Sequence, residues 1–339
     1  MKGFRKLTGF ISFVLAVGLS TGFLAPTFAF AASSKPIKWT VIGSWPLVAV
    51  EMKEQLVPWV QAINERLKGR LEISISGPEA VAPTEQLKAV RDGIFDANYT
   101  NPAYHAGDLG LGMGLDIFFA TSKEMRAAGA YEVMAEAYKK TQGVYYLGNF
   151  RNGAGYQIMM RNKCIQKADL TGFKLRTNPF YDGLVHGLGG STVGIPGSEL
   201  YTSLEKGVVD GATWAAIGSI DFKWYEVAQY QIRPTFGQNS SSLLVNVDSW
   251  NKLPKDLQDE VTKITRELEE STHNKLKGLW KEEEAEVLRR GQKFCELPPE
   301  ESKKFLDTFY NQTWVFVNKL SPQYTPRLKE AVEKVKASR

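Results

Sequence analysis

Hydrophobic positions beyond residue 37 change their spacing twice. Residues 38–42 form a short run of β-forming side chains, which the Gly-Ser-Trp-Pro segment at 43–46 ends. Apolar residues then recur at helical spacing from about 50 to 67, where Pro58 marks a kink or a later helix start. Residues 71–75 alternate as in a strand. Strands that alternate with helices of these lengths predict an α/β fold with a largely parallel sheet that is covered on both faces.

One pattern of polar and apolar positions occurs twice along the chain. Each copy is typical of a short helix, then a glycine that can take the left-handed conformation at the helix end, then a two-residue apolar step into a strand. Matching positions lie 114 residues apart (199 − 85): Glu85 with Glu199, Gly93 with Gly207, and Asp96 with Asp210. We interpret this as a structural repeat in two similarly built lobes. Ligands bind at the carboxyl ends of strands in open α/β sheets, so residues 98–101 and 212–214 are predicted to face a shared crevice.

A long helix is predicted towards the C-terminus. Residues 255–290 contain no proline and one glycine, Gly278, and their apolar positions recur at helical spacing. A continuous helix of this length would span about 54 Å and could cross both lobes. The alternative is two shorter helices that are broken near Gly278. The acidic residues at 282–284 are interpreted as part of a solvated helix face.

Residues 1–31 have the pattern of a cleaved signal peptide. A basic start at 1–6 precedes an apolar stretch over about 7–24, and residues 29–31 fit an A-x-A cleavage site. The alternative is an anchoring transmembrane helix. Cleavage is favoured because Gly, Ser and Thr interrupt the apolar stretch and no basic cluster follows Ala32. No cysteine follows the cleavage site, so we expect a periplasmic protein that is not a lipoprotein.

Composition and charge narrow the function classes. The 339 residues include 42 Lys+Arg and 37 Asp+Glu, and three of the basic residues lie in the leader, which leaves +2 (39 − 37) beyond it. So small a net charge gives no reason to expect nucleic acid or an anionic membrane as partner. The length suggests about two domains. After export, Cys164 and Cys295 could form a disulfide or remain as two thiols.

Enzyme motifs are missing from the sequence. It contains no H-E-x-x-H, paired C-x-x-C, G-x-S-x-G or P-loop pattern, and His105, His186 and His273 are scattered. Nothing in the sequence combines a nucleophile, a base and a group that orients the base. We therefore predict a protein that is not an enzyme, with no catalytic residues and no cofactor.

The best candidate for ligand chemistry is an arginine at a predicted strand exit. Phe173 and Leu175 alternate with Lys174 and Arg176, and Asn178 followed by proline predicts a helix start. Arg176 would then lie at a strand's carboxyl end beside a helix N-terminus, whose free N–H groups also favour an anion. Its guanidinium could hold a carboxylate by two parallel hydrogen bonds. An ordinary surface arginine is the alternative from these residues alone.

These motifs together resemble a known family. Residues 86–96, 168–176, 199–214 and 250–258, in this order and followed by the long helix, are similar to the DctP-type extracytoplasmic solute receptors of TRAP (tripartite ATP-independent periplasmic) transporters. The resemblance covers essentially all of the chain beyond the leader. It implies a two-lobed α/β periplasmic-binding-protein fold with hinge strands and a long helix that crosses both lobes. Lobe I would comprise residues 32–153 plus 240–279, and lobe II residues 154–239 plus 280–339.

The resemblance also implies roles for individual residues. Arg176 matches the arginine that binds the ligand carboxylate, and Gln157 and Trp214 match ligand-site positions of keto-acid-binding relatives, in which a cation also binds. Those relatives carry acidic residues at the position of Thr213 and near Gln238. Because this chain lacks both carboxylates, the hard oxygen ligands of a cation are gone and we expect no metal.

Differences from other relatives limit the class of ligand that we expect. Sialic-acid-binding relatives have arginine at the position of Tyr156 and asparagine at that of Trp214, so sialic acid is not expected. Other aromatic and amide residues form a set of pocket candidates: Trp45, Tyr99, Asn101, Tyr104, Phe118 and Phe180. As a set they favour a monocarboxylate with an apolar or aromatic body over a dicarboxylate.

The resemblance implies a receptor that closes over one small organic acid and delivers it to the small and large membrane subunits of a TRAP transporter. Two alternatives come from other classes of protein. One is a co-receptor that presents its ligand to a membrane sensor kinase. The other is a secreted enzyme on the same scaffold.

Overall fold

The computed structural model describes residues 35–338, which form one compact unit. The expected signal peptide at 1–31 lies outside the described residues. No helix in this described part combines the length and the apolar character needed to span a bilayer.

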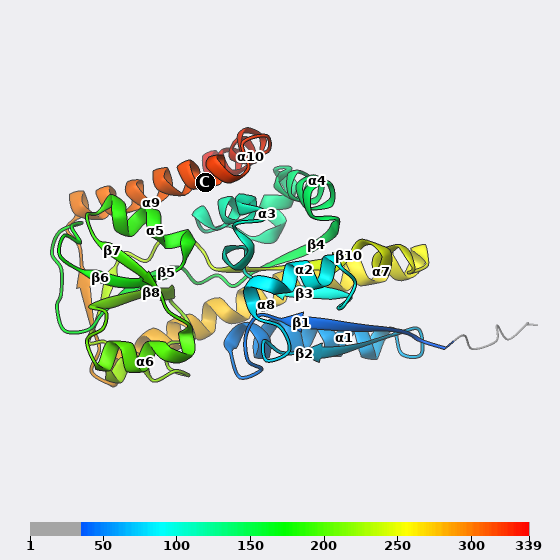
Figure 1. The fold of residues 1–339 in the computed structure, drawn as a ribbon, viewed down its shortest axis with the longest axis horizontal. Coiled ribbons are helices and arrows are strands. Elements are labelled where there is room, and N and C mark those ends of the chain that lie inside the picture. The colour runs from blue at the N-terminus through cyan, green and yellow to red at the C-terminus, as the bar shows by residue number, and fades with distance from the viewer. Residues whose placement is uncertain (1–34, 339) are drawn as a thin grey trace, which may run out of the picture. The chain divides into compact units, whose positions relative to one another are not determined.

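The first of two sheets contains five strands (Figure 1). Their order is β2 (Leu71–Ser76), β1 (Ile37–Gly43), β3 (Ala97–Thr100), β10 (Ser240–Asn246) and β4 (Val144–Arg151). β1 pairs in parallel with β2 and β3, whereas β10 runs antiparallel to both β3 and β4.

The second sheet contains six strands in the order β11 (Lys293–Glu296), β9 (Tyr230–Arg233), β5 (Tyr156–Met160), β8 (Gly211–Ala215), β6 (Lys174–Thr177) and β7 (Ser191–Gly194). β5 is antiparallel to β8 and β9, and the other pairs are parallel. The expectation of a largely parallel sheet is therefore corrected to two mixed sheets. β5 and β10 each arrive from the other sheet through a short segment, 152–155 or 234–239, so no crossover helix forces them to run parallel.

Helices cover the faces of both sheets. Those before β6 are η1 (Met52–Leu56), α1 (Val57–Arg66), η2 (Pro83–Glu85), α2 (Gln86–Arg91), η3 (Pro102–His105), η4 (Gly110–Ile117), α3 (Ser122–Ala127) and α4 (Ala130–Gln142). Those after it are α5 (Pro179–Gly187), α6 (Gly197–Glu205), η5 (Trp224–Glu226), α7 (Val247–Asn251), α8 (Lys255–Arg289), α9 (Pro299–Leu320) and α10 (Thr325–Ala337). Pro58 lies in the first turn of α1, and the π-helical segment η1 directly precedes that helix, so the proline marks an irregularity within continuous helical backbone and not a later start.

The predicted repeat is present in the structure. α2 and α6 are each followed by a glycine in the left-handed region, Gly93 with φ 76° and Gly207 with φ 70°. The aspartates that follow make the same two contacts in their two sheets. The carboxylate of Asp96 accepts a hydrogen bond from the backbone N–H of Thr40 on β1 (2.8 Å), and the backbone N–H of Asp96 donates to the carbonyl of Thr40 (3.0 Å). Asp210 makes both contacts with Lys174 on β6, each at 2.8 Å.

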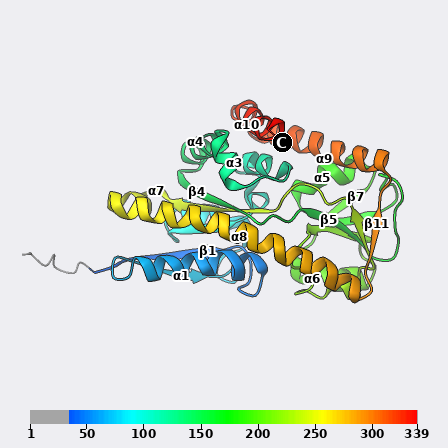
Figure 2. The same cartoon turned by 180° about the vertical axis from the view of Figure 1, so that it is seen from behind.

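α8 is one continuous helix of 35 residues, so the alternative with a break near Gly278 is excluded. Figure 2 shows it extending from the elements of the first sheet towards those of the second. Near its end, the expectation of a solvated acidic face holds for Glu282, which is exposed, and is wrong for Glu283 and Glu284. Glu283 accepts hydrogen bonds from the backbone of Gly218 and the hydroxyl of Ser219, both at 2.7 Å, and Glu284 pairs with Arg233 at 2.7 Å. Gly218 and Ser219 follow β8, and Arg233 ends β9. The helical spacing of the sequence alone therefore does not reveal these contacts.

Two features tie the C-terminal region to the rest. Cys164 and Cys295 form a disulfide, which resolves the open alternative and links the segment after β5 to β11. α9 packs against α5 and η4, and α10 packs against α3, α4 and η4. Residues 325–337 therefore lie beside helices of the first half, although they belong to the 280–339 block that we assigned to lobe II. The lobe boundaries themselves stay a prediction.

Candidate functional site

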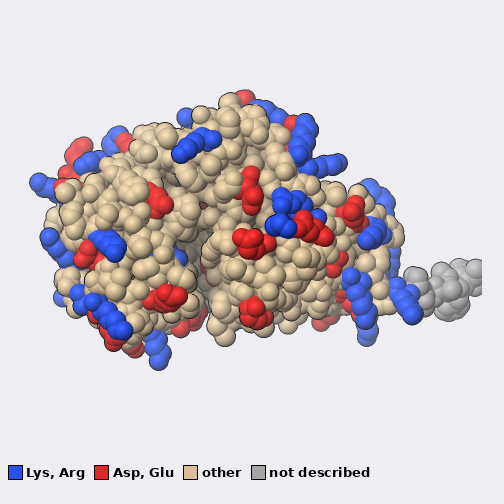
Figure 3. Space-filling view, viewed as in Figure 1, with Lys and Arg blue, Asp and Glu red and all other residues tan. Residues whose placement is uncertain are grey.

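A buried pocket lies where the ends of strands from both sheets meet. Its lining residues are Trp45, Glu51, Asn101, Tyr104, Tyr156, Arg176, Asn178, Tyr181, Trp214, Ala215 and Asn239. Asn101 follows β3 and Trp214 lies on β8, so the two copies of the repeat both reach this pocket, as predicted. Its empty volume is about 380 Å³, open solvent included. In Figure 3, charged residues of both signs are dispersed over the visible face, which is hollowed near its centre.

Arg176 is held rigidly in this pocket. It lies on β6 and is 6% exposed. Its Nε donates to the carbonyl of Ile195 (2.8 Å) and its Nη1 to the carbonyl of Thr213 (3.2 Å). The guanidinium carbon lies 4.6 Å from the centre of the Trp214 ring, at cation–π distance. Nη2 has no hydrogen-bond partner among residues 35–338, so this donor remains for a ligand.

The charge of Arg176 is only partly offset by its surroundings. Burial lowers the pKa of its guanidinium from the ordinary value, while Tyr104 and Tyr181 oppose that shift. Arginine nonetheless remains protonated at any physiological pH. A buried cation that meets only carbonyl groups and aromatic rings provides a strong site for an anion.

The helix start beside Arg176 is as predicted. Asn178 precedes α5, its side-chain oxygen accepts a hydrogen bond from the backbone N–H of Phe180 (3.0 Å), and Pro179 is the first helical residue. Asn178 also lines the pocket. The strand exit and the helix N-terminus therefore meet at the same place, where both favour an anion.

Tyr156 and Asn239 connect the two halves of the pocket. The hydroxyl of Tyr156 donates to the carboxylate of Asp116 (2.8 Å) and to Oδ1 of Asn239 (3.3 Å). Nδ2 of Asn101 also donates to Oδ1 of Asn239 (3.3 Å). Burial raises the pKa of Asp116 to about 6, although Arg151 and hydrogen bonds from Ser240 and Tyr156 oppose the shift.

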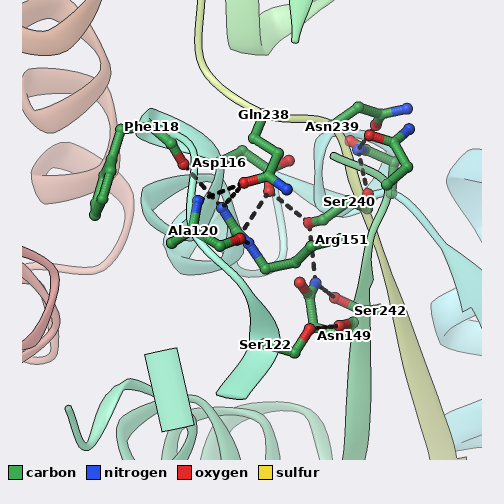
Figure 4. A network of polar contacts seen from close by, with 12 residues as sticks. Asp116, Phe118, Ala120, Ser122, Asn149, Arg151, Gln238, Asn239, Ser240 and Ser242 are labelled. Carbon is green, nitrogen blue, oxygen red and sulfur yellow. Dashed lines mark hydrogen bonds and ion pairs between the residues drawn. The ribbon is translucent and has the colours of Figure 1, made fainter. Parts of the chain in front are cut away.

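Gln238 belongs to a buried polar network behind the pocket (Figure 4). Its Oε1 accepts hydrogen bonds from the backbone N–H of Ala120 (2.6 Å) and from Nη2 of Arg151 (3.0 Å). It does not line the pocket. The network fixes the segment that leads from β9 into β10, one of the connections between the two sheets, and its effect on the pocket is indirect.

Two more predicted site residues lie behind the pocket wall. Thr213 is fully buried, and its hydroxyl donates to the carbonyl of Arg176 (3.3 Å), so it helps to position the arginine from behind. Gln157 is also fully buried and contacts the carbonyl of Ala215 and Nη1 of Arg233. Neither side chain is part of the lining.

Three of the six remaining predicted residues form a wall of the pocket on the side of the first sheet. Trp45 packs edge-on against Tyr99 and Tyr104, with ring centres 6.1 and 5.8 Å apart. Trp45, Asn101 and Tyr104 line the pocket. Tyr99, Phe118 and Phe180 do not: Tyr99 donates to Gln55, and Phe180 packs on Tyr156 and Phe309.

Comparison with known proteins places this geometry in a family. The family model DctP, described as bacterial extracellular solute-binding protein, family 7, matches residues 49–319, well over half of the chain. The chain belongs to this family. Residues 49–319 include every lining residue of the pocket except Trp45.

One sequence relative and two solved structures characterise the similarity. A monocarboxylate 2-oxoacid-binding periplasmic protein of Nostoc sp. (strain PCC 7120) is 26% identical over 235 residues, which are 66% of this chain and 64% of that protein. The match therefore spans slightly less than two thirds of the Nostoc protein.

Among solved structures, a TRAP periplasmic solute-binding protein from Desulfovibrio salexigens with bound orotic acid superposes with a TM-score of 0.78 at 19% identity. The superposition covers 88% of this chain and 99% of that one. A second, from Bordetella bronchiseptica with bound (R)- and (S)-mandelate, has a TM-score of 0.73 at 21% identity and covers 90% and 100%. The predicted two-lobed periplasmic-binding-protein fold is thereby confirmed.

Several lining residues of this family member were not predicted as ligand contacts: Glu51, Asn178, Tyr181, Ala215 and Asn239. Asn178 was identified as the start of α5, and Ala215 directly follows Trp214, so both carried a local signal. Glu51 and Asn239 carried none, because an acidic residue at a helix start and an amide in a connection are common at protein surfaces.

Proposed function

We propose that this protein is a periplasmic receptor that encloses a small monocarboxylic acid and delivers it to the membrane subunits of a TRAP transporter. The main support for the proposal is the burial and the hydrogen bonding of Arg176. Its guanidinium is buried, it lines the pocket, two of its nitrogens are held by backbone carbonyls, and Nη2 has no hydrogen-bond partner in the described chain. A carboxylate would neutralise this charge and accept the remaining hydrogen bond.

Capture would occur by closure of the two halves. The ligand favours the closed arrangement because residues from both sheets contact it only there. The lining supports this mechanism, since Trp45, Asn101 and Tyr104 belong to the first half and Arg176 and Trp214 to the second. Delivery to a small and a large membrane subunit follows from the family, whose TRAP members work with such permeases.

The ligand is proposed to be a monocarboxylate with an apolar or aromatic body. The pocket provides one buried guanidinium and walls of tryptophan and tyrosine, and among residues 35–338 no second basic side chain lines it. The Nostoc relative, named as a monocarboxylate 2-oxoacid-binding protein, and the mandelate bound to the Bordetella protein support this class.

Further parts of the proposal concern the whole chain. Residues 1–31 would be removed as a signal peptide on export, without attachment of a lipid. The site would work without a cation and without catalysis.

A thermal-shift panel tests the ligand class. Mandelate, benzoate and pyruvate are compared with succinate and malate on the purified protein after removal of bound ligand by partial unfolding and dialysis. A ligand at a free concentration of 100 times its Kd stabilises the folded protein by about 2.7 kcal/mol. This stabilisation gives a measurable rise in Tm. We expect the rise with monocarboxylates, and stabilisation by succinate alone would contradict the proposal. Native mass spectrometry of the untreated protein identifies any co-purified acid.

A further inference from the structure

Glu51 is an acidic residue in the pocket that carboxylate binding by Arg176 does not explain. It directly precedes η1 and is 6% exposed, and it lies in the lining. Its Oε1 accepts a hydrogen bond from Nδ2 of Asn239 (3.2 Å). Beyond a hydrogen bond with the backbone of Glu51 itself, the carboxyl group has no further hydrogen-bond partner among residues 35–338, and no ion pair of the described chain includes it.

The orientation of Glu51 is fixed by its amide neighbour. Oδ1 of Asn239 accepts hydrogen bonds from both Tyr156 and Asn101, so the side-chain oxygen of Asn239 must face those two donors. Its amino group then faces Glu51. Asn239 thereby anchors one carboxyl oxygen, and no other side chain of the described residues bonds the carboxyl group.

Charge in the pocket is arranged with opposite signs on its two walls. Arg176 comes from the second sheet, whereas Glu51 comes from the connection after β1 of the first. The phenol of Tyr104 is influenced by both: burial raises its pKa, Arg176 lowers it and Glu51 raises it further. A ligand in this pocket thus meets a hydrogen-bond donor with positive charge at one wall and an acceptor oxygen at the other.

A buried carboxyl group that pairs with no cation of the described chain is costly without a ligand. Burial raises the pKa of Glu51 to about 7, the carboxylates of Glu283 on α8 and Asp221 after β8 add to the shift, and hydrogen bonds from Asn239 and its own backbone oppose it. A second carboxylate on the ligand would be repelled by the ionised form of Glu51, because the two charges have the same sign. A hydroxyl group can donate to the ionised form or accept from the protonated form, so it suits this residue near neutral pH.

We infer that Glu51 sets the specificity of the pocket by bonding a hydroxyl group of the ligand, so that the preferred ligands are hydroxylated monocarboxylic acids. This inference rests on the proposed function, because it requires the ligand carboxylate to lie at Arg176. It adds a second recognition point to the ligand class.

Matched acids that differ by one hydroxyl test the inference. Calorimetric titrations compare phenylacetate with mandelate and 3-hydroxyphenylacetate, and propionate with lactate. We expect at least one hydroxylated acid to bind the wild type about tenfold or more tightly than its parent, the scale of one hydrogen bond to a charged group. Equal affinity within every pair would overturn the inference.

Variants assign the preference to Glu51. Glu51→Leu should abolish the hydroxyl preference while leaving the affinity for the parent acid within about threefold of wild type, and Glu51→Gln, which retains a neutral acceptor, should give an intermediate preference. The control is Glu54→Gln, three residues further along η1, whose carboxylate pairs with Lys275 at 2.5 Å and does not line the pocket. A preference that persists in Glu51→Leu would contradict the inference, as would tighter binding of phenylglycine than of mandelate, which indicates an ammonium ligand.

The two proposals fail in different ways. If no monocarboxylate binds the wild type, or if Arg176→Ala binds as well as the wild type, the proposed function is wrong and the inference falls with it. If the parent acids bind and Arg176→Ala loses them but no hydroxyl preference exists, the inference alone is wrong. Should Glu51→Leu fail to fold, as judged by its thermal transition, the comparison of Glu51→Gln with the wild type decides the question.

Discussion

Arg176 and Glu51 show how single residues in this pocket gain their properties from burial. The arginine keeps its charge because carbonyl groups and a tryptophan ring replace part of its lost hydration. The glutamate has weaker compensation, from hydrogen bonds with its own backbone and with Asn239, so burial moves its pKa to about 7. Arg176 therefore gives the site a permanent positive charge, whereas Glu51 gains or loses a proton near neutral pH.

The raised pKa of Glu51 predicts a pH-dependent effect on stability. In the folded protein the carboxyl binds a proton up to about pH 7, whereas in the unfolded chain it releases it near 4.5. Stability is therefore lost as the pH rises through this window, by up to about 3 kcal/mol from this residue. Glu51→Gln removes the titration, so the variant should gain stability relative to wild type between pH 4 and pH 8.

Denaturant unfolding of both proteins at several pH values measures this gain. The comparison subtracts the contributions of Asp116 and Glu283, whose pKa values burial also raises. A stability difference between variant and wild type that stays constant from pH 4 to pH 8 would contradict the assignment.

At the residue scale, sequence analysis found Arg176 because three local signals coincide there. It lies at a strand exit, it is followed by an asparagine cap and a proline, and it falls within a family motif. Glu51 acquires its role through contact with Asn239, 188 residues away, and no local pattern encodes that contact.

The secondary-structure elements that could be predicted are those with local causes. α8 could be predicted from the helical spacing of its apolar residues, and the start of α5 from its asparagine cap. The two repeat units could be predicted from glycine and aspartate residues at a fixed offset. The direction of β5 and β10 could not be predicted, because it depends on which sheet the chain enters. The buried position of Glu283 depends likewise on a loop that packs on α8 from elsewhere in the chain.

Gly278 allows a test of α8 as a single element. A Cβ at this position would meet nothing within 4 Å, and the residue lies inside a continuous helix. Gly278→Ala should therefore stabilise the protein by about 0.5–1 kcal/mol, because alanine loses less conformational freedom in a helix than glycine does.

Gly69→Ala is the matched control for this substitution. It has equally open surroundings but a φ of 78°, so alanine there should destabilise the protein. Chemical denaturation of both variants provides the comparison. Destabilisation by Gly278→Ala would indicate that α8 bends or opens at this point.

On the scale of the whole molecule, stability and ligand binding depend on different parts of the structure. The disulfide Cys164–Cys295 closes a loop of 131 residues within the second half, and neither cysteine lines the pocket. The pocket depends instead on the two connections between the sheets and on the polar network of Arg151 and Gln238 that holds one of them.

Removal of the disulfide should therefore lower stability without changing affinity. Cys164→Ala/Cys295→Ala is expected to lose about 2–4 kcal/mol of unfolding free energy. Calorimetry at a temperature where the variant is fully folded should give a Kd for its best monocarboxylate within about threefold of wild type. A large loss of affinity would mean that the disulfide helps to shape the pocket.

The most direct test of the account is the affinity of Arg176 variants for a monocarboxylate. Calorimetric titration of mandelate and pyruvate into wild type and Arg176→Ala compares the two proteins, and Arg161→Ala is the control for the loss of a half-buried arginine that does not line the pocket. We predict that Arg176→Ala weakens binding of the better ligand at least about 100-fold, since a buried carboxylate is left unpaired. Arg161→Ala should leave it unchanged. An Arg176→Ala protein that folds and binds the acid with wild-type affinity would contradict the account.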